Sequence, residues 1–123
     1  MPDTRGVGGL GEKIASDFLK KSGYRVIEKN FRSRYGEIDI IALDGQDIVF
    51  VEVKLRNNLS FGSGREAVSP AKQLRIIKSA VDYIKKKSLE GRNVRFDVIE
   101  VCGRRDTVEH IKSAFGSSRL YTL

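Results

Sequence analysis

The chain has 123 residues, and its 23 Lys and Arg against 16 Asp and Glu give a formal net charge of +7. A chain of this length encloses one core, and a hydrophobic content of 40% excludes an intrinsically disordered protein. A single cysteine, Cys102, excludes an intrachain disulfide and a cysteine-rich zinc site, and no apolar run reaches the ~18 residues of a membrane span. We therefore expect one cytoplasmic domain over residues 1–123, with flexible ends at 1–8 and 113–123, and the positive charge favours a nucleic acid as partner.

Two amphipathic helices are expected. Apolar residues recur at helical spacing between residues 9 and 22. Glu12 falls at the margin of this apolar stripe, so its carboxylate is able to reach along the edge of the core. Ser69 and Pro70 are typical of a helix N-cap and first position, and the residues after them predict a second helix through about Lys87.

Runs of β-branched and alternating residues predict a sheet. Two of these runs, residues 37–43 and 48–55, are separated by Asp44-Gly45-Gln46-Asp47, a short turn typical of a β-hairpin. The other expected strands cover residues 24–31, 94–101 and 107–111. The order of one helix, three strands, one helix and one or two strands predicts an α/β fold with a mixed central sheet flanked by helices.

Acidic residues on the two hairpin strands are predicted to meet. Side chains alternate between the faces of a strand, so Glu37 and Asp39 share one face, and Glu52 and Lys54 share one face. A two-residue loop at 45–46 places Asp39 opposite Glu52 and Glu37 opposite Lys54. A loop at 44–45 instead makes Asp39 a diagonal neighbour of Glu52. The four groups cluster in either register.

The opposite face of the hairpin is predicted to be apolar and covered by a helix. Its residues are Ile38, Ile40, Ala42, Val49, Val51, Val53 and Leu55. A polar face behind such an apolar one is ordinary in a one-sided sheet, where a Glu37–Lys54 ion pair would satisfy two of the charges. The alternative interpretation is that the polar residues of the hairpin form a functional site.

Two opposed carboxylates repel each other and form part of the oxygen shell that Mg²⁺ or Mn²⁺ prefers. Lys54 is predicted to point into the same space as Asp39 and Glu52. With a phosphodiester present, this lysine would orient the attacking water or stabilise developing negative charge. We therefore expect a metal site that hydrolyses phosphodiesters.

This spacing resembles the PD-(D/E)xK nuclease superfamily, with Asp39 as the first acid and Glu52-Val53-Lys54 as the (D/E)xK element. The stretches GLGEKIASDFLKKSGYRVIEKNFR, GEIDIIALDGQDIVFVEVKLR, FGSGREAVSPAKQLRI and RFDVIEV also look like the uncharacterised bacterial YraN-like family, which is similar to archaeal Holliday junction resolvases. The resemblance covers roughly residues 6–111. It implies a restriction-endonuclease-like αβββαβ core.

The resemblance also implies roles for particular residues. Glu12 matches the first-helix acid, Asp39 and Glu52 the two metal ligands, and Lys54 the motif lysine. Together these four would be the catalytic residues. Ile38 stands where the pattern has proline, a variation that leaves the chemistry unchanged.

Residues outside the motif are candidates for nucleic-acid contacts. Arg56, Phe61 and Arg65 lie on the long loop 56–68 and suit backbone contacts and base stacking. Lys72 and Gln73 open the second helix near the expected metal face and are candidates for phosphate contacts, although a solvated first turn explains them nearly as well.

Three further residues are predicted to carry no chemistry. Asp97 lies in the middle of a predicted strand, and we expect its side chain to be buried against a partner group. His110 is expected to be a surface histidine, because no companion motif for a serine or cysteine hydrolase is present. Cys102 is expected to be a buried small apolar residue.

The leading hypothesis is a Mg²⁺- or Mn²⁺-dependent endonuclease that hydrolyses phosphodiester bonds of DNA, including branched DNA of the Holliday-junction type. The first alternative is a non-catalytic nucleic-acid-binding module on the same fold, which would bind in a salt-dependent way and form no product. The second is a protein-interaction role. A homodimer is expected by analogy, since resolvase-like enzymes act as symmetric pairs.

Overall fold

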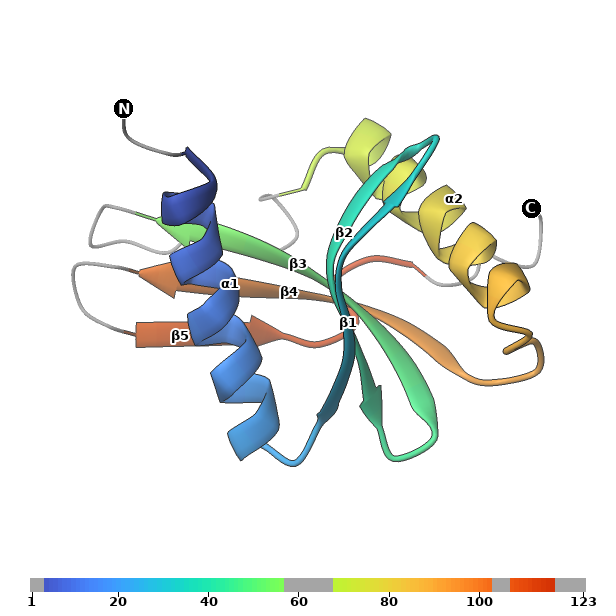
Figure 1. Cartoon of the computed structure of the whole chain (residues 1–123), viewed down its shortest axis with the longest axis horizontal. Helices are drawn as coiled ribbons and strands as arrows, with labels where there is room; N and C mark the ends of the chain where they lie inside the picture. The colour runs from blue at the N-terminus through green and yellow to red at the C-terminus, as the bar shows by residue number, and fades with distance from the viewer. Residues whose placement is uncertain (1–3, 57–67, 103–106, 117–123) are drawn as a thin grey trace.

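The computed structural model describes residues 4–56, 68–102 and 107–116 (Figure 1). Its elements are α1 (Thr4–Lys21), β1 (Arg25–Ser33), β2 (Gly36–Asp44), β3 (Asp47–Arg56), α2 (Pro70–Lys86), β4 (Val94–Cys102) and β5 (Thr107–Ile111). The first six follow the expected αβββαβ order, and β5 is the additional edge strand.

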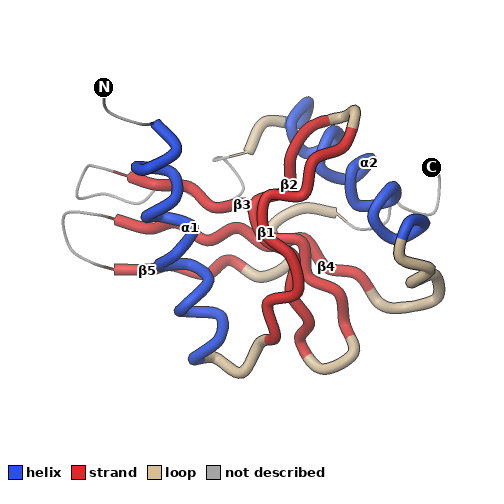
Figure 2. The backbone as a smooth tube through the Cα atoms, viewed as in Figure 1, coloured by secondary structure: helices blue, strands red, loops and turns tan. Residues whose placement is uncertain are grey.

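The five strands form one mixed sheet in the order β1-β2-β3-β4-β5. Strands β3 and β4 are parallel and every other neighbouring pair is antiparallel. The connection between β3 and β4 passes through α2, as a parallel pair requires. The sheet is strongly twisted, and the two helices pack on its opposite faces (Figure 2). The fold is therefore the predicted α/β fold, with a mixed central sheet flanked by helices.

Each helix closes its own half of the core. On the α2 side, Ile77 and Tyr83 pack with Phe50 and Phe96. On the α1 side, Ala15 and Leu19 pack with strand residues, among them Ile40, Val49, Val51 and Ile99. Burying each large apolar side chain stabilises the fold by ~1.5 to 3 kcal/mol. Both faces of β3 are thus covered, and the central strand is rigidly held.

Helix α1 begins at Thr4, five residues before the predicted start at residue 9. The glycine-rich start disfavours a helix by propensity, which is why the sequence predicts the later start. At Gly11, a Cβ atom would lie 3.7 to 3.8 Å from the side chains of Leu55 and Val53. These are ordinary van der Waals distances, so α1 packs directly on the end of β3 at this point, and the neighbouring Glu12 is brought to the sheet.

The β2–β3 hairpin has the first of the two predicted registers. Asp44 pairs with Asp47, so Gly45 and Gln46 form the loop, and Gly45 has a φ of 62° that favours glycine. The pairing continues to Ile40 and Val51.

The prediction that all the apolar hairpin residues share one face is wrong at Ile38. Ile38 and Ile41 both pack on the α2 side, whereas Ile40 packs on the α1 side, so the alternation of faces is interrupted between Ile38 and Ile40. Opposite this point Asn30 of β1 has a φ of 54°, in the left-handed region that asparagine tolerates. The hairpin therefore twists at Asp39, the residue between the two isoleucines.

Helix α2 starts as predicted. The Ser69 hydroxyl accepts a hydrogen bond from Lys72 N at 3.2 Å, and Pro70 occupies the first turn. The helix ends at Lys86 with Lys87 as its C-cap. Lys72, in its first turn, is thereby held at a defined position beside the sheet.

A buried polar network joins β4 to β5 and to Tyr24, the residue directly before β1. The Asp97 carboxylate is fully buried and accepts hydrogen bonds from Arg95 Nε at 2.9 Å, His110 Nε2 at 2.7 Å and Ser113 N at 3.0 Å. Arg95 also donates to Tyr24 Oη at 2.7 Å. The prediction for Asp97 is confirmed.

The prediction that His110 is a surface residue is wrong, because its side chain is 8% exposed and contacts the rings of Phe18 and Tyr24. Its burial depends on antiparallel pairing of β5 with β4, which places His110 beside Ile99. Cys102 is buried, as predicted. Among the described residues, neither helix has the length and apolar character needed to cross a bilayer.

Candidate active site

Three carboxylates from two elements converge where α1 approaches the twist in β2. Oxygen atoms of Glu12, Glu37 and Asp39 all lie within 4.8 Å of one another. Glu12 comes from α1, and the other two come from β2. Glu37 is exposed, whereas Glu12 and Asp39 are half-buried, so the cluster opens to solvent on one side. We call these three residues the acid cluster.

Asp39 is anchored to the neighbouring strand by its side chain. The Val53 N–H donates a hydrogen bond to Asp39 Oδ2 at 2.8 Å. Backbone pairing between β2 and β3 is present from Asp44 to Ile40, so at Asp39 the carboxylate continues the contact between the two strands. This bond fixes the position of the Asp39 side chain before any ligand arrives.

Burial and neighbouring carboxylates disfavour the ionised form of Asp39. Burial first, and then the negative charge of Glu52, raise the pKa of Asp39 from 3.8 to about 8, with a smaller contribution from Glu12. The hydrogen bond from Val53 opposes this shift and is outweighed. Asp39 thus favours a positive partner, either a proton or a cation.

Glu52 lies beside Asp39 and is bound by the second helix. It is 6% exposed, and its Oε1 lies 2.6 Å from Lys72 Nζ. The ion pair joins β3 to the first turn of α2, at the position that the Ser69 cap provides. Lys72 therefore lies at the predicted site, in contact with one of the predicted ligands.

Glu37 and Lys54 do not form the ion pair that a simple solvated sheet face would contain. The Glu37 carboxylate instead lies 3.4 Å from Arg32 Nε on β1, and both side chains are largely exposed. The twist at Asp39 is the cause, because it turns Glu37 toward α1 and away from the line of regular cross-strand pairs. The interpretation of these residues as an ordinary cross-strand pair is therefore wrong.

Lys54 is half-buried two residues beyond Glu52, on the same face of β3. In the parallel pairing of β3 with β4 it lies beside Glu100, a fully buried acid. Burial raises the pKa of Glu100, while the charges of Arg56 and Lys54 lower it. Glu100 also pairs with Arg56 NH2 at 3.5 Å. On this face Lys54 and Arg56 of β3 thus lie between two acids, Glu52 of the same strand and Glu100 of β4.

The candidate nucleic-acid contacts have different outcomes. Arg56 points its guanidinium toward Glu100, an orientation that serves the fold. Gln73 donates from Nε2 to the Val68 carbonyl at 2.9 Å, so it holds the chain ahead of α2. Phe61 and Arg65 lie outside the described residues. Lys72 is the one that contacts an acid of the predicted metal pair.

Comparison with known proteins identifies the family. The model of the family described as "Uncharacterised protein family UPF0102" matches residues 11–101. The chain belongs to this family. A UPF0102 protein of Trichlorobacter lovleyi is 50% identical over 113 residues, covering 89% of each chain. That of Syntrophus aciditrophicus is 48% identical over 110 residues, covering 88% of this chain and 87% of the relative. That of Rhodococcus opacus is 41% identical over 118 residues, covering 94% and 100%.

Solved structures were compared as well. The structure of Pyrococcus furiosus SfsA in complex with Ca²⁺ aligns over 89% of this chain and 64% of the SfsA chain, with 18% identity and a TM-score of 0.36.

The residues that the UPF0102 chain brings together suit a hard divalent cation. Such ions take carboxylate oxygens and keep several waters, and the acid cluster supplies three carboxylates at an open edge. Burial, and then the negative charges of Glu52 and Glu12, raise the pKa of Asp39, so a cation would replace the proton that otherwise neutralises this carboxylate. The donor set and its electrostatics therefore fit Mg²⁺ or Mn²⁺.

The sequence analysis left the role of Glu37 open and did not single out Glu100. Glu37 fits a ligand and a structural residue equally well on the sequence alone, and the structure brings its carboxylate to Glu12 and Asp39. Glu100 was read only as part of an alternating strand, although its position two residues after Val98 places it on an inward face. An acid at an inward position of a parallel strand is the signal that would have found it.

Proposed function

We propose that this protein is a metal-dependent endonuclease that hydrolyses phosphodiester bonds of DNA. The observation that carries the proposal is the convergence of Glu12, Glu37 and Asp39 within 4.8 Å at an open edge of an endonuclease-like sheet. Glu52 and Lys54 follow on the adjacent strand. Acids, a lysine and an open edge are the components that phosphodiester hydrolysis requires.

The acid cluster would hold the cation, with Glu52 completing or orienting the set. When bound, a divalent cation neutralises phosphate charge and makes a nucleophile available at neutral pH. Asp39 Oδ2 is fixed by the Val53 N–H, and its carboxylate also lies within hydrogen-bonding reach of Glu52, so both acids would face the same cation. Glu12 brings α1 into the site and links metal binding to the packing of that helix.

Lys54 and Lys72 have different roles in the proposed mechanism. Lys54 lies beyond Glu52 on one face of β3, where its ammonium would stabilise negative charge that develops on the phosphate. Lys72 holds Glu52 in place through the 2.6 Å ion pair. We therefore assign Lys54 to the reacting phosphate and Lys72 to positioning of Glu52.

Cleavage of labelled DNA with Mg²⁺ or Mn²⁺ tests this proposal. The substrates are a linear duplex, a single strand and a four-way junction, and the variants are Glu12→Gln, Asp39→Asn and Lys54→Met. Asp17→Asn is the matched control, because Asp17 lies on the same helix as Glu12 but is exposed and pairs with Lys13.

We expect each site variant to lose at least ~100-fold in cleavage rate, with Asp17→Asn unchanged. Equal cleavage by wild type, Glu12→Gln and Asp39→Asn would refute the assignment. Salt-dependent binding without product under any divalent ion would instead support a non-catalytic nucleic-acid-binding module.

A further inference from the structure

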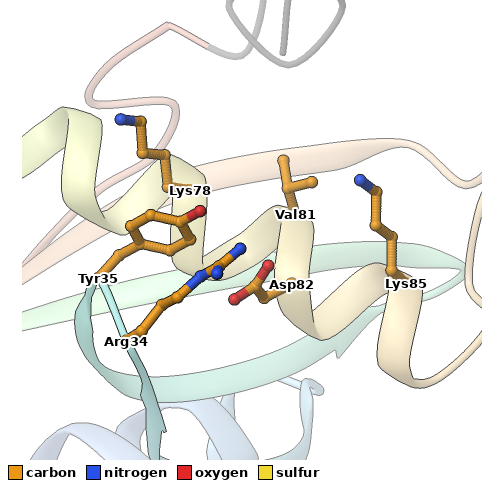
Figure 3. Close-up of a pocket in the computed structure, with 6 residues that line it drawn as sticks. All are labelled: Arg34, Tyr35, Lys78, Val81, Asp82 and Lys85. Atoms are coloured by element: carbon orange, nitrogen blue, oxygen red, sulfur yellow. The ribbon is translucent and has the colours of Figure 1, made fainter.

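A second polar feature lies on the outer side of α2. A pocket of about 160 Å³ opens between this helix and the turn that joins β1 to β2 (Figure 3). Its lining residues are Arg34, Tyr35, Lys78, Val81, Asp82 and Lys85. None of them belongs to the acid cluster or to the predicted nucleic-acid contacts.

The pocket is positively charged and carries an aromatic wall. Three lining residues are basic and one, Asp82, is acidic. Within the described part of the chain, no ion pair occupies Arg34, Lys78 or Lys85. These cations are therefore available to an anionic ligand.

Two of the cations are gathered around the Tyr35 ring. Arg34 Cζ lies 5.0 Å from the ring centroid and Lys78 Nζ lies 5.5 Å from it. Both distances are within cation–π range. A ligand that enters here would meet an aromatic ring and positive charge at the same point, the combination that proteins use for a base and its phosphate.

The turn that carries Tyr35 is held against α2. The hydroxyls of Ser33 and Ser79 are 2.7 Å apart, and Ser79 is fully buried. The Ser33 hydroxyl also accepts a hydrogen bond from the Tyr35 N–H at 3.0 Å. Gly36 follows with a φ of 145°, which only glycine adopts readily. The turn is thus preorganised, and binding would cost little loop entropy.

Basic residues on α2 connect this pocket to Glu52 of the candidate active site. Lys72, Arg75 and Lys78 follow one another at three-residue spacing, so they lie along one side of α2. Lys72 contacts Glu52 at the candidate active site, Arg75 lies beside Gly36 of the turn, and Lys78 lines the pocket. A nucleic-acid backbone that followed this side of α2 would pass from the candidate active site to the pocket.

We propose that the pocket between α2 and the β1–β2 turn binds an unpaired nucleotide of the DNA substrate, with its base against Tyr35 and its phosphates on Lys78 and Arg34. The proposal deepens the proposed function, on which it rests for the identity of the substrate. It names DNA with a single-stranded segment as the substrate class, because a paired base has no free face for the ring.

Binding of labelled oligonucleotides in EDTA tests this inference without requiring cleavage. The probes are a single-stranded oligothymidylate and a blunt duplex of equal length, measured by fluorescence anisotropy over a range of salt. The variants are Tyr35→Leu and Lys78→Gln, and their folding is checked by thermal unfolding. Lys21→Gln is the matched control, because it removes the same charge from an exposed position on α1.

We expect Tyr35→Leu to weaken single-strand binding about fivefold or more, with an unchanged salt slope and unchanged duplex affinity. Lys78→Gln should reduce the single-strand salt slope by about 0.7, the loss of one phosphate contact. The inference is overturned if both variants bind the single strand like Lys21→Gln, or if wild type binds no oligonucleotide. Loss of binding in the variants with no cleavage by wild type would overturn only the proposed function.

Discussion

Replacing Asp39 by Asn should stabilise the metal-free protein at neutral pH. The native state holds a proton on Asp39 up to about pH 8, whereas the unfolded chain releases it near pH 3.8. Between these values the unfolded state binds fewer protons, so stability falls as pH rises. Asn carries no charge, and its oxygen is able to accept the Val53 N–H as the carboxylate does.

The size of the stabilisation follows from the pH range between the two pKa values of Asp39. Within this range each pH unit lowers the free energy of unfolding of wild type by about 1.4 kcal/mol, and about three units separate the ordinary pKa of 3.8 from pH 7. The upper bound is therefore about 4 kcal/mol. Because neighbouring side chains relax, we expect Asp39→Asn to gain ~1 to 3 kcal/mol at pH 7.

Urea unfolding in EDTA at pH 5, 7 and 8 measures this gain for wild type, Asp39→Asn and the Asp17→Asn control. The difference between wild type and Asp39→Asn should widen as pH rises, while Asp17→Asn should follow wild type. A difference that stays constant with pH, or a variant that becomes relatively less stable as pH rises, would refute the reasoning.

Two further predictions concern the supports of the site. Asp97→Asn should cost ~2 to 3 kcal/mol in urea unfolding, because it removes the charge-assisted hydrogen bonds of Asp97 to Arg95 and His110, while half-buried Arg95 keeps its ion pair with Asp44. Burial opposes ionisation of Asp97, but hydrogen bonds from His110 and Arg95 outweigh it and hold the pKa of Asp97 below the usual range. The stability of wild type therefore falls as pH drops through that pKa, and the variant lacks this dependence. A loss under ~1 kcal/mol in Asp97→Asn would contradict a stabilising role of the network. Ser69→Ala should cost ~1 kcal/mol by removing the N-cap of α2, and Ser69→Asp should restore it; equal unfolding midpoints for wild type and Ser69→Ala would show that the cap does not hold the helix.

Local signals in the sequence were sufficient for the elements and reduced the hairpin register to two choices, of which the structure has the first. The loop at Gly45 determines which strand residues face each other, and the Ser69 and Pro70 pair marks the start of α2. The margin of an apolar stripe placed Glu12 at the core edge, and the structure brings it to Asp39. Each of these signals acts over a few residues, which is why sequence alone reveals it.

The parts that could not be predicted depend on contacts between distant segments. The twist at Asp39 involves Asn30 of another strand and a side-chain bond to Val53, and neither has a local signature. The ion pair between Glu52 and Lys72 requires α2 to be packed in place. Glu12 and Asp39 were therefore predictable as members of the acid cluster, whereas the role of Glu37 stayed open and the anchoring of the cluster was not predictable.

Isothermal titration of Mn²⁺ into wild type, Asp39→Asn and Asp17→Asn tests the central claim most directly, because metal binding needs no knowledge of the substrate. The account predicts saturable binding by wild type and Asp17→Asn that is lost in Asp39→Asn. Equal binding by all three proteins, or no saturable binding by wild type, would contradict the claim that Glu12, Glu37 and Asp39 form a metal site.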